Sequence, residues 1–129
     1  MAFTIELTNG DEFNVDFFSK AIMFQNIIDM DINKNTRSLL LYVLRKTLYF
    51  DKLVDSLSMY HLQKKLELGA PTLRTAISNA EDLNLIFVKR SLGGNIQSRG
   101  KYNEFRLSDE LLIDLIEYVN QVREDNDFK

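Results

Sequence analysis

A run of apolar residues at helical spacing, directly after a Gly-Ala-Pro sequence, constrains the fold of this chain more than any other feature. Its predicted buried stripe comprises Leu73, Ala76, Ile77, Ala80 and Leu83, which recur at i, i+3, i+4, i+7 and i+10. Pro71 is tolerated in a first helical turn because the amides there have no partner within the helix. The pattern therefore predicts a helix that begins around Ala70 and turns a polar face outward. That face comprises Thr72, Arg74, Thr75, Ser78, Asn79 and Asp82.

Two further helices are expected before this one. Apolar residues at helical spacing predict a helix from Thr36 to about Tyr49; they are Leu39, Leu40, Val43, Leu44 and Leu48. Ser58 is a suitable N-cap for a short helix in which Leu62 and Leu66 share a face, and Gly69 interrupts that helix.

Two strands and a final helix are expected after it. Leu85–Arg90 and Tyr102–Leu107 have strand patterns, and residues 91–101 between them are Gly-rich and basic. Ser108 is the expected cap of a helix over 109–123, with Asp109 and Glu110 in its first turn, where acidic side chains suit the helix dipole. The apolar residues of this helix cover more than one face, which is wider than packing on a single core needs. They are Leu111, Leu112, Leu115, Ile116, Tyr118, Val119 and Val122.

The N-terminal residues 3–17 alternate apolar and polar side chains on either side of a turn signal at 8–11. A two-residue turn at Asn9 and Gly10 would pair apolar with polar side chains. Pairing Ile5 with Phe13 or Val15 requires a three-residue loop with Gly10 in the left-handed region. We therefore predict a β-hairpin, followed by a short helix over 18–28 and an Asx-rich break at 29–35.

This order of elements predicts an α+β fold, a winged helix-turn-helix with an extra N-terminal β-hairpin and a C-terminal helix. At 129 residues the chain has the length of one domain. Within residues 1–129 we expect an N-terminal part (1–33), a winged-helix core (34–107) and a C-terminal helix (108–129) that offers a surface for dimerisation.

Charge is unevenly distributed along the chain. Residues 34–106 carry a net charge of +7, whereas 1–33 and 107–129 each carry −5. A basic middle between acidic ends fits either a core that binds a polyanion or chance clustering on a mixed surface, and the positions of the basic residues decide between the two.

Several classes of protein are excluded or disfavoured. The chain has no Cys and one His, so thiolate and multi-His metal sites and Cys nucleophiles are excluded. No residue set supports an enzyme, and we expect a cytoplasmic protein without a cofactor. The segment from Gly94 to Lys101 departs from the phosphate-loop motif in its spacing and is followed by a strand. Asp29–Asn33 lacks the Gly and Glu of a calcium loop and is better explained as a helix cap, and His61 has no evident catalytic partner.

Polar and basic side chains collect on the parts of this fold that would meet DNA. The third helix offers short donors and acceptors and an Arg that can bond guanine through two nitrogens. The preceding helix and the loop between the strands offer cations for phosphates. The candidate DNA-binding residues are Lys64, Lys65, Thr72, Arg74, Thr75, Ser78, Asn79, Lys89, Arg90, Arg99 and Lys101, with Arg106 as a further cation.

The chain also resembles winged-helix domains of phage replication proteins of the lambda O type and related replisome organisers. The similarity covers roughly 34–107 and rests on Thr72-Leu73-Arg74, Ala76-Ile77, Glu81 and Leu85-Ile86, together with the upstream runs 44–52 and 55–58. Four positions depart from the pattern. Glu67 and Asn84 stand where Gly is usual, Gln63 where Ala is usual, and Ala80 where Leu is usual.

These observations predict a non-catalytic, sequence-specific protein that binds double-stranded DNA, of phage or plasmid type, at a replication origin, partition site or promoter. We expect a homodimer formed through the N-terminal hairpin, helix 109–123, or both, since two half-sites increase specificity. The resemblance adds a protein partner in a replication or partition machinery. The alternatives are a transcriptional repressor only, and a winged helix that binds a protein instead of DNA.

Overall fold

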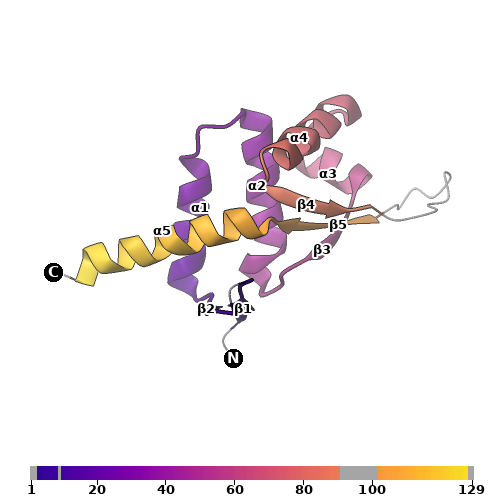
Figure 1. The fold of residues 1–129 in the computed structure, drawn as a ribbon. Coiled ribbons are helices and arrows are strands. Elements are labelled where there is room, and N and C mark those ends of the chain that lie inside the picture. Colours follow the sequence, from indigo (N-terminus) through magenta and orange to yellow (C-terminus); the bar gives the residue numbers. More distant parts are fainter. Residues whose placement is uncertain (1–2, 9, 91–101, 128–129) are drawn as a thin grey trace.

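The computed structural model describes residues 3–8, 10–90 and 102–127 of the chain (Figure 1). Its elements, in order, are β1 (Thr4–Glu6), β2 (Glu12–Asn14), α1 (Phe17–Ile28), α2 (Lys34–Lys46), the 3-10 turn η1 (Leu48–Phe50), β3 (Asp55–Ser58), α3 (Met59–Leu66), α4 (Ala70–Asp82), β4 (Ile86–Lys89), β5 (Tyr102–Leu107) and α5 (Asp109–Asp127).

The central unit is a winged helix-turn-helix, as predicted. Helices α2, α3 and α4 pack against an antiparallel sheet in the order β3-β5-β4, with Leu57 opposite Asn103 and Val88 opposite Phe105. Strand β3 was not predicted as a strand. It is only four residues long, and Leu57 is its one apolar side chain, so its sequence alone carries almost no alternation. Pairing with β5 stabilises it as a strand.

The core lies between the helices and one face of the sheet. Leu39, Leu40, Val43 and Leu44 of α2 are at most 1% exposed, and Phe105 of β5 is fully buried beneath them. Helix α2 begins two residues earlier than predicted, after Asn33, whose side chain accepts the amide of Asn35. It ends at Lys46, and residues 48–50 continue as η1. The expected helix to Tyr49 is therefore wrong in its last turn, where the Thr47 hydroxyl donates to the Val43 carbonyl and the backbone leaves the helix.

One predicted core residue is exposed. Leu83 was placed in the buried stripe of α4, but its side chain is 55% exposed. The helix ends at Asp82, and Asn84 then takes a left-handed conformation with φ of 57°. Because this turn redirects the chain into β4, Leu83 no longer follows the helical spacing, and Leu85 enters the core instead.

The N-terminal hairpin has the predicted register. Ile5 lies opposite Phe13, and the Leu7 amide donates to the Asp11 carbonyl at 2.7 Å, which leaves three residues in the connection. Gly10 has a φ of +90°, as this type of loop requires. The expected helix follows as α1.

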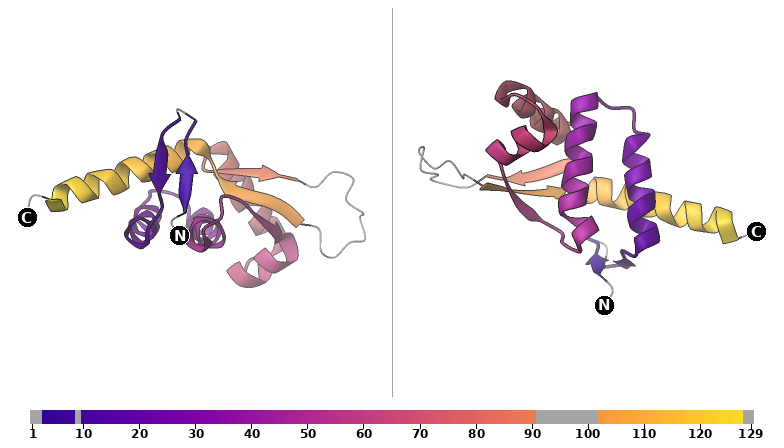
Figure 2. Two further views of the ribbon diagram at one scale, coloured as in Figure 1. Left: turned by 90° about the horizontal axis from the view of Figure 1, so that it is seen from below. Right: turned by 180° about the vertical axis from the view of Figure 1, so that it is seen from behind.

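Helices α1 and α5 pack beside the winged-helix core. Helix α1 runs antiparallel to α2, and α5 crosses α1 (Figure 2). The broad apolar face of α5 is largely used within the chain, because Leu111, Leu112, Leu115, Ile116 and Val119 are all buried. Packing within one chain therefore accounts for the width of this apolar face, without contact to a second copy of the chain. At the far end of α5, Arg123 donates to Asp16 at 2.7 Å and ties this helix to the start of α1. Within the described residues, no helix is long and apolar enough to cross a membrane.

Candidate nucleic-acid interface

Helix α4 presents the predicted polar face to solvent. Gly69 occupies the N-cap position and Pro71 the first turn, so the helix begins where the sequence predicts. Leu73, Ala76, Ile77 and Ala80 are at most 5% exposed. Thr72, Arg74, Thr75 and Ser78 are exposed on the other side, and Asn79 is half-buried. The Thr75 hydroxyl donates to the Pro71 carbonyl at 3.1 Å, which leaves its oxygen lone pairs as acceptors.

Helix α3 presents two cations beside α4. Ser58 caps α3 by accepting the His61 amide at 3.0 Å. Lys64 and Lys65 are both exposed in its last turn, and the exposed His61 has no catalytic partner on the described surface. The Lys64 ammonium lies 5.0 Å from the centre of the Tyr60 ring, and Tyr60 raises the pKa of Lys64 above its ordinary value. This contact holds Lys64 near the start of α3.

The turn between α3 and α4 is built around Glu67. This residue has a φ of 56° and closes α3 in the left-handed conformation, which Gly adopts most easily. The Leu68 amide then donates to the Gln63 carbonyl at 3.0 Å. The left-handed turn thus forms although Glu67 has a side chain, and it sets the direction in which α4 leaves α3.

The sheet contributes Lys89 and Arg90 at the end of β4. Lys89 is exposed. Arg90, predicted to face DNA, instead makes two hydrogen bonds to the Glu81 carboxylate of α4, at 2.8 and 3.0 Å. Glu81 raises the pKa of Arg90, so this guanidinium stays charged. The pair joins the last turn of α4 to the end of β4, and it occupies two of the five N–H donors of Arg90.

A groove of about 530 Å³ lies between α4 and the sheet. Arg74, Ser78 and Glu81 form its α4 side on successive turns, and Arg90 closes the sheet side. Its complete lining is Met59, Arg74, Ile77, Ser78, Glu81, Val88, Arg90, Asn103 and Phe105. Both arginines thus lie at one groove with an apolar floor.

No protein-family model and no curated protein sequence matches the chain. A mutant of MepR from S. aureus superposes with a TM-score of 0.48 at 20% identity, over 84% of this chain and 70% of that one. A MepR mutant bound to an oligodeoxyribonucleotide gives the same values. A possible transcriptional regulator from Methanosarcina mazei Go1 has a TM-score of 0.47 at 14% identity, over 95% and 89% of the two chains. The assignment of a winged helix-turn-helix rests on the topology of this chain itself.

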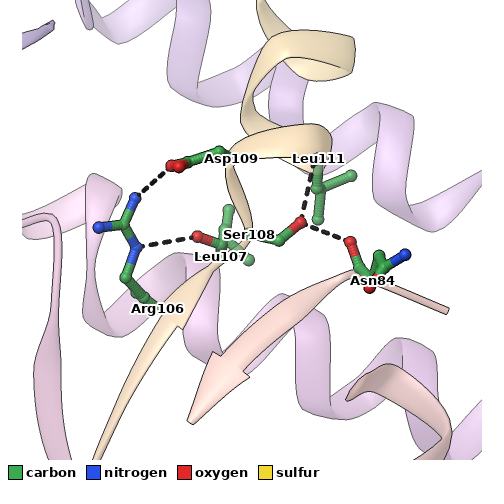
Figure 3. A network of polar contacts seen from close by, with 6 residues as sticks. All are labelled: Asn84, Arg106, Leu107, Ser108, Asp109 and Leu111. Atoms are coloured by element: carbon green, nitrogen blue, oxygen red, sulfur yellow. Dashed lines mark hydrogen bonds and ion pairs between the residues drawn. The ribbon is translucent and has the colours of Figure 1, made fainter. Parts of the chain in front are cut away.

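The turn that follows α4 is held by a polar network (Figure 3). The Ser108 hydroxyl donates to the Asn84 carbonyl and accepts the Leu111 amide at 3.0 Å, as the predicted cap of α5. Arg106, named as a further cation for DNA, bonds Asp109 at 2.7 Å and its side chain is only 27% exposed. Its position at the α5 end of β5 and its ion pair remove it from the candidate interface.

Two predicted contacts, Arg99 and Lys101, lie outside the described residues, and so does the loop 91–101 that contains them. Two residues in the interface were not predicted for it. Tyr60 could have been noticed from its spacing four residues before Lys64. The role of Glu81 opposite Arg90 has no local sequence signal, because the two residues meet only when β4 folds back along α4. Within residues 3–8, 10–90 and 102–127, no three His, Asp or Glu side chains gather where they could hold a metal ion.

Proposed function

We propose that this chain is a non-catalytic, sequence-specific protein that binds double-stranded DNA, with α4 in the major groove. The observation that carries the proposal is the exposed face of α4. It offers Thr72, Arg74, Thr75 and Ser78 to solvent, and residues 70–80 include no acidic side chain. The helix has 13 residues, about 20 Å, and fits a groove about 12 Å wide.

The exposed residues divide into two chemical roles. We assign the base contacts to Arg74, Ser78 and Thr72, because their side chains are exposed donors and acceptors and the Arg74 guanidinium can bond guanine through two nitrogens. Lys64, Lys65 and Lys89 flank α4 and supply charge for phosphates without reading sequence. Arg99 and Lys101 remain predicted phosphate contacts.

The acidic parts of the chain support this orientation. The acidic C-terminal part of α5 extends away from α3 and α4, and the hairpin β1-β2 lies at the opposite end of the molecule from α4 (Figure 1). Carboxylates in those positions do not oppose the approach of a phosphate backbone.

The biological role proposed is regulation at a promoter, an origin or a partition site. The first is a repressor or activator role; the other two follow only from the resemblance to phage replication proteins and remain predictions. A single winged helix covers a short site, so we further propose that two copies act on two half-sites.

The test is binding of labelled duplexes by fluorescence anisotropy, after selection of preferred sites from a random library. Log affinity for random duplex should fall linearly with log salt. The Arg74→Ala variant should lose about 1–3 kcal/mol on the selected site and relax base preference, whereas Lys65→Ala should weaken all sequences together. Asn120→Ala on the exposed side of α5 is the matched control and should change neither the affinity for the selected site nor the affinity for random duplex. No binding to any duplex at low salt would refute the proposal and favour a protein-binding winged helix.

A further inference from the structure

The outer face of α1 is exposed and uncharged, and Gln25 is the one polar residue among the exposed residues of this helix. Phe17 is 78% exposed, Ile28 is 54% exposed, Ala21 is exposed and Phe24 is half-buried between them. These four residues recur at i, i+4, i+7 and i+11 and therefore form one stripe along the helix. A second and different stripe of α1, with Met23 and Ile27, is fully buried in the core. Among the described elements, none lies in front of α1 in the right-hand view of Figure 2.

The edge of this stripe is also apolar. Tyr49 and Phe50 of η1 are 39% and 52% exposed. The Tyr49 ring packs edge-on against Phe24, with centroids 6.0 Å apart, and against Phe50 at 5.1 Å. Contiguous exposed aromatic surface of this kind is typical of an interaction site in a soluble domain.

Charge does not oppose an identical partner at this face. Lys20 is the only charged residue among the 12 of α1. Its side chain is 15% exposed and lies 2.8 Å from the Asp51 carboxylate, which neutralises it. The stripe itself carries no net charge, although the chain as a whole carries −3. Asp16 and Asp29 lie at its two ends, and the Asp16 carboxylate is paired with Arg123 at 2.7 Å.

The stripe is complementary to itself when a second α1 runs antiparallel across it. A two-fold axis midway between Ala21 and Phe24 places Phe17 opposite Ile28 of the second copy. The same axis places the small Ala21 opposite the large Phe24, and both pairings occur twice. A symmetric dimer requires such a self-complementary surface.

We propose that α1 is a homodimer interface, in which the stripe Phe17, Ala21, Phe24 and Ile28 packs antiparallel against the same stripe of a second copy. The contact lies on α1 and not on the hairpin or α5. A 12-residue helix is about 18 Å long, so the interface is at the small end of stable complexes. We therefore expect a reversible dimer with a dissociation constant on the order of micromolar. The proposal is independent of DNA binding.

Cysteine cross-linking tests the antiparallel register, because the chain has no Cys of its own. The variants Phe17→Cys and Ile28→Cys are prepared with tags of different mass, mixed and oxidised. The mixture should give a cross-linked pair of one variant with the other. Each variant alone should remain uncross-linked, because identical positions would lie about 16 Å apart along the helix axis, beyond disulfide reach. Equal cross-linking of the single variants would overturn the proposal.

Sedimentation velocity from about 1 to 100 µM, without DNA, tests the surface itself. The wild-type chain should shift from monomer to dimer, and Ala21→Glu should remain monomeric. The matched control Asn120→Glu adds the same charge at an exposed position of α5 and should dimerise as wild type does. Thermal unfolding followed by circular dichroism should show unchanged folding in both variants, since each position is exposed on a helix. A wild-type chain that is monomeric throughout, or a dimer that persists in Ala21→Glu, would overturn the proposal.

Discussion

The Glu81–Arg90 ion pair provides a direct test of how the groove beside α4 works. In the free protein the Arg90 guanidinium bonds Glu81 through two nitrogens, at 2.8 and 3.0 Å, so its positive charge is neutralised by the carboxylate. The substitution Glu81→Gln removes the charge that holds it while keeping the size of the side chain. We expect the variant to bind random duplex DNA more tightly than wild type.

The structure sets the size of the expected changes in folding stability and in the salt dependence of DNA binding. The Arg90 and Glu81 side chains are 57% and 31% exposed, so the pair is screened by solvent and its loss should cost less than about 1 kcal/mol of folding stability. One additional phosphate contact by Arg90 should steepen the slope of log affinity against log salt by about 0.9. Between 50 and 200 mM salt this slope corresponds to about a 3-fold greater loss of affinity than in wild type.

The assay is anisotropy of a labelled random duplex across this salt range, with unfolding by urea measured in parallel. Asp82→Asn is the matched control, because it removes the same charge one residue later, from an exposed side chain in the same last turn of α4. Any general effect of charge should appear in both variants, whereas the steeper slope should appear only in Glu81→Gln. Weaker binding by Glu81→Gln, or identical behaviour of the two variants, would refute the reasoning.

Three further predictions concern stability, each measured by chemical denaturation. Ser108→Ala should cost about 2 kcal/mol, because it removes both the α5 cap and the hydrogen bond to the Asn84 carbonyl. Ser58→Ala removes the α3 cap alone and should cost about 1 kcal/mol. Equal costs would argue against the Asn84 bond. Glu67→Gly should be neutral or stabilise by about 0.5 kcal/mol, because Gly adopts the φ of 56° without strain. Glu67→Val should destabilise the fold, because a β-branched residue is strained at this φ. A Val variant more stable than the Gly variant would contradict the left-handed conformation of residue 67. The hydrogen bonds from Ser19, together with the charge of Arg123, lower the pKa of Asp16 below its ordinary value of 3.8. The unfolded chain therefore binds a proton at Asp16 more readily than the folded chain does. Asp16 thus contributes folding stability above about pH 4, and this contribution is lost as the pH falls further. The difference in free energy of unfolding between wild type and Asp16→Asn should therefore become smaller as the pH falls below 4. A difference that stays constant with pH would contradict the lowered pKa of Asp16.

Sequence patterns predicted the elements whose side chains bury a regular stripe. Helix α4 and the β1-β2 hairpin have the predicted faces and register, because one wrong face would expose Ile77 or Phe13. Ser58 and Ser108 were found as caps because capping depends on residues within one turn of the chain.

The remaining features depend on contacts between distant segments. Strand β3 forms only because β5 lies beside it, and the Glu81–Arg90 pair forms only because β4 returns along α4. Leu83 was misplaced because the helical spacing was extended beyond Asp82, where α4 ends and the left-handed Asn84 turns the chain. The exposed stripe of α1 was hidden in a segment that is apolar at mixed spacing, since a buried and an exposed apolar face overlap in it.

Titration of a selected duplex into isotope-labelled protein, followed through backbone amide signals, locates the DNA-binding surface. At low salt we expect the largest shifts at residues 72–79 of α4, smaller shifts at Lys64, Lys65 and Lys89, and none on the outer face of α1. The largest shifts on α1 or α5, with α4 unchanged, would contradict the proposed binding of DNA by α4.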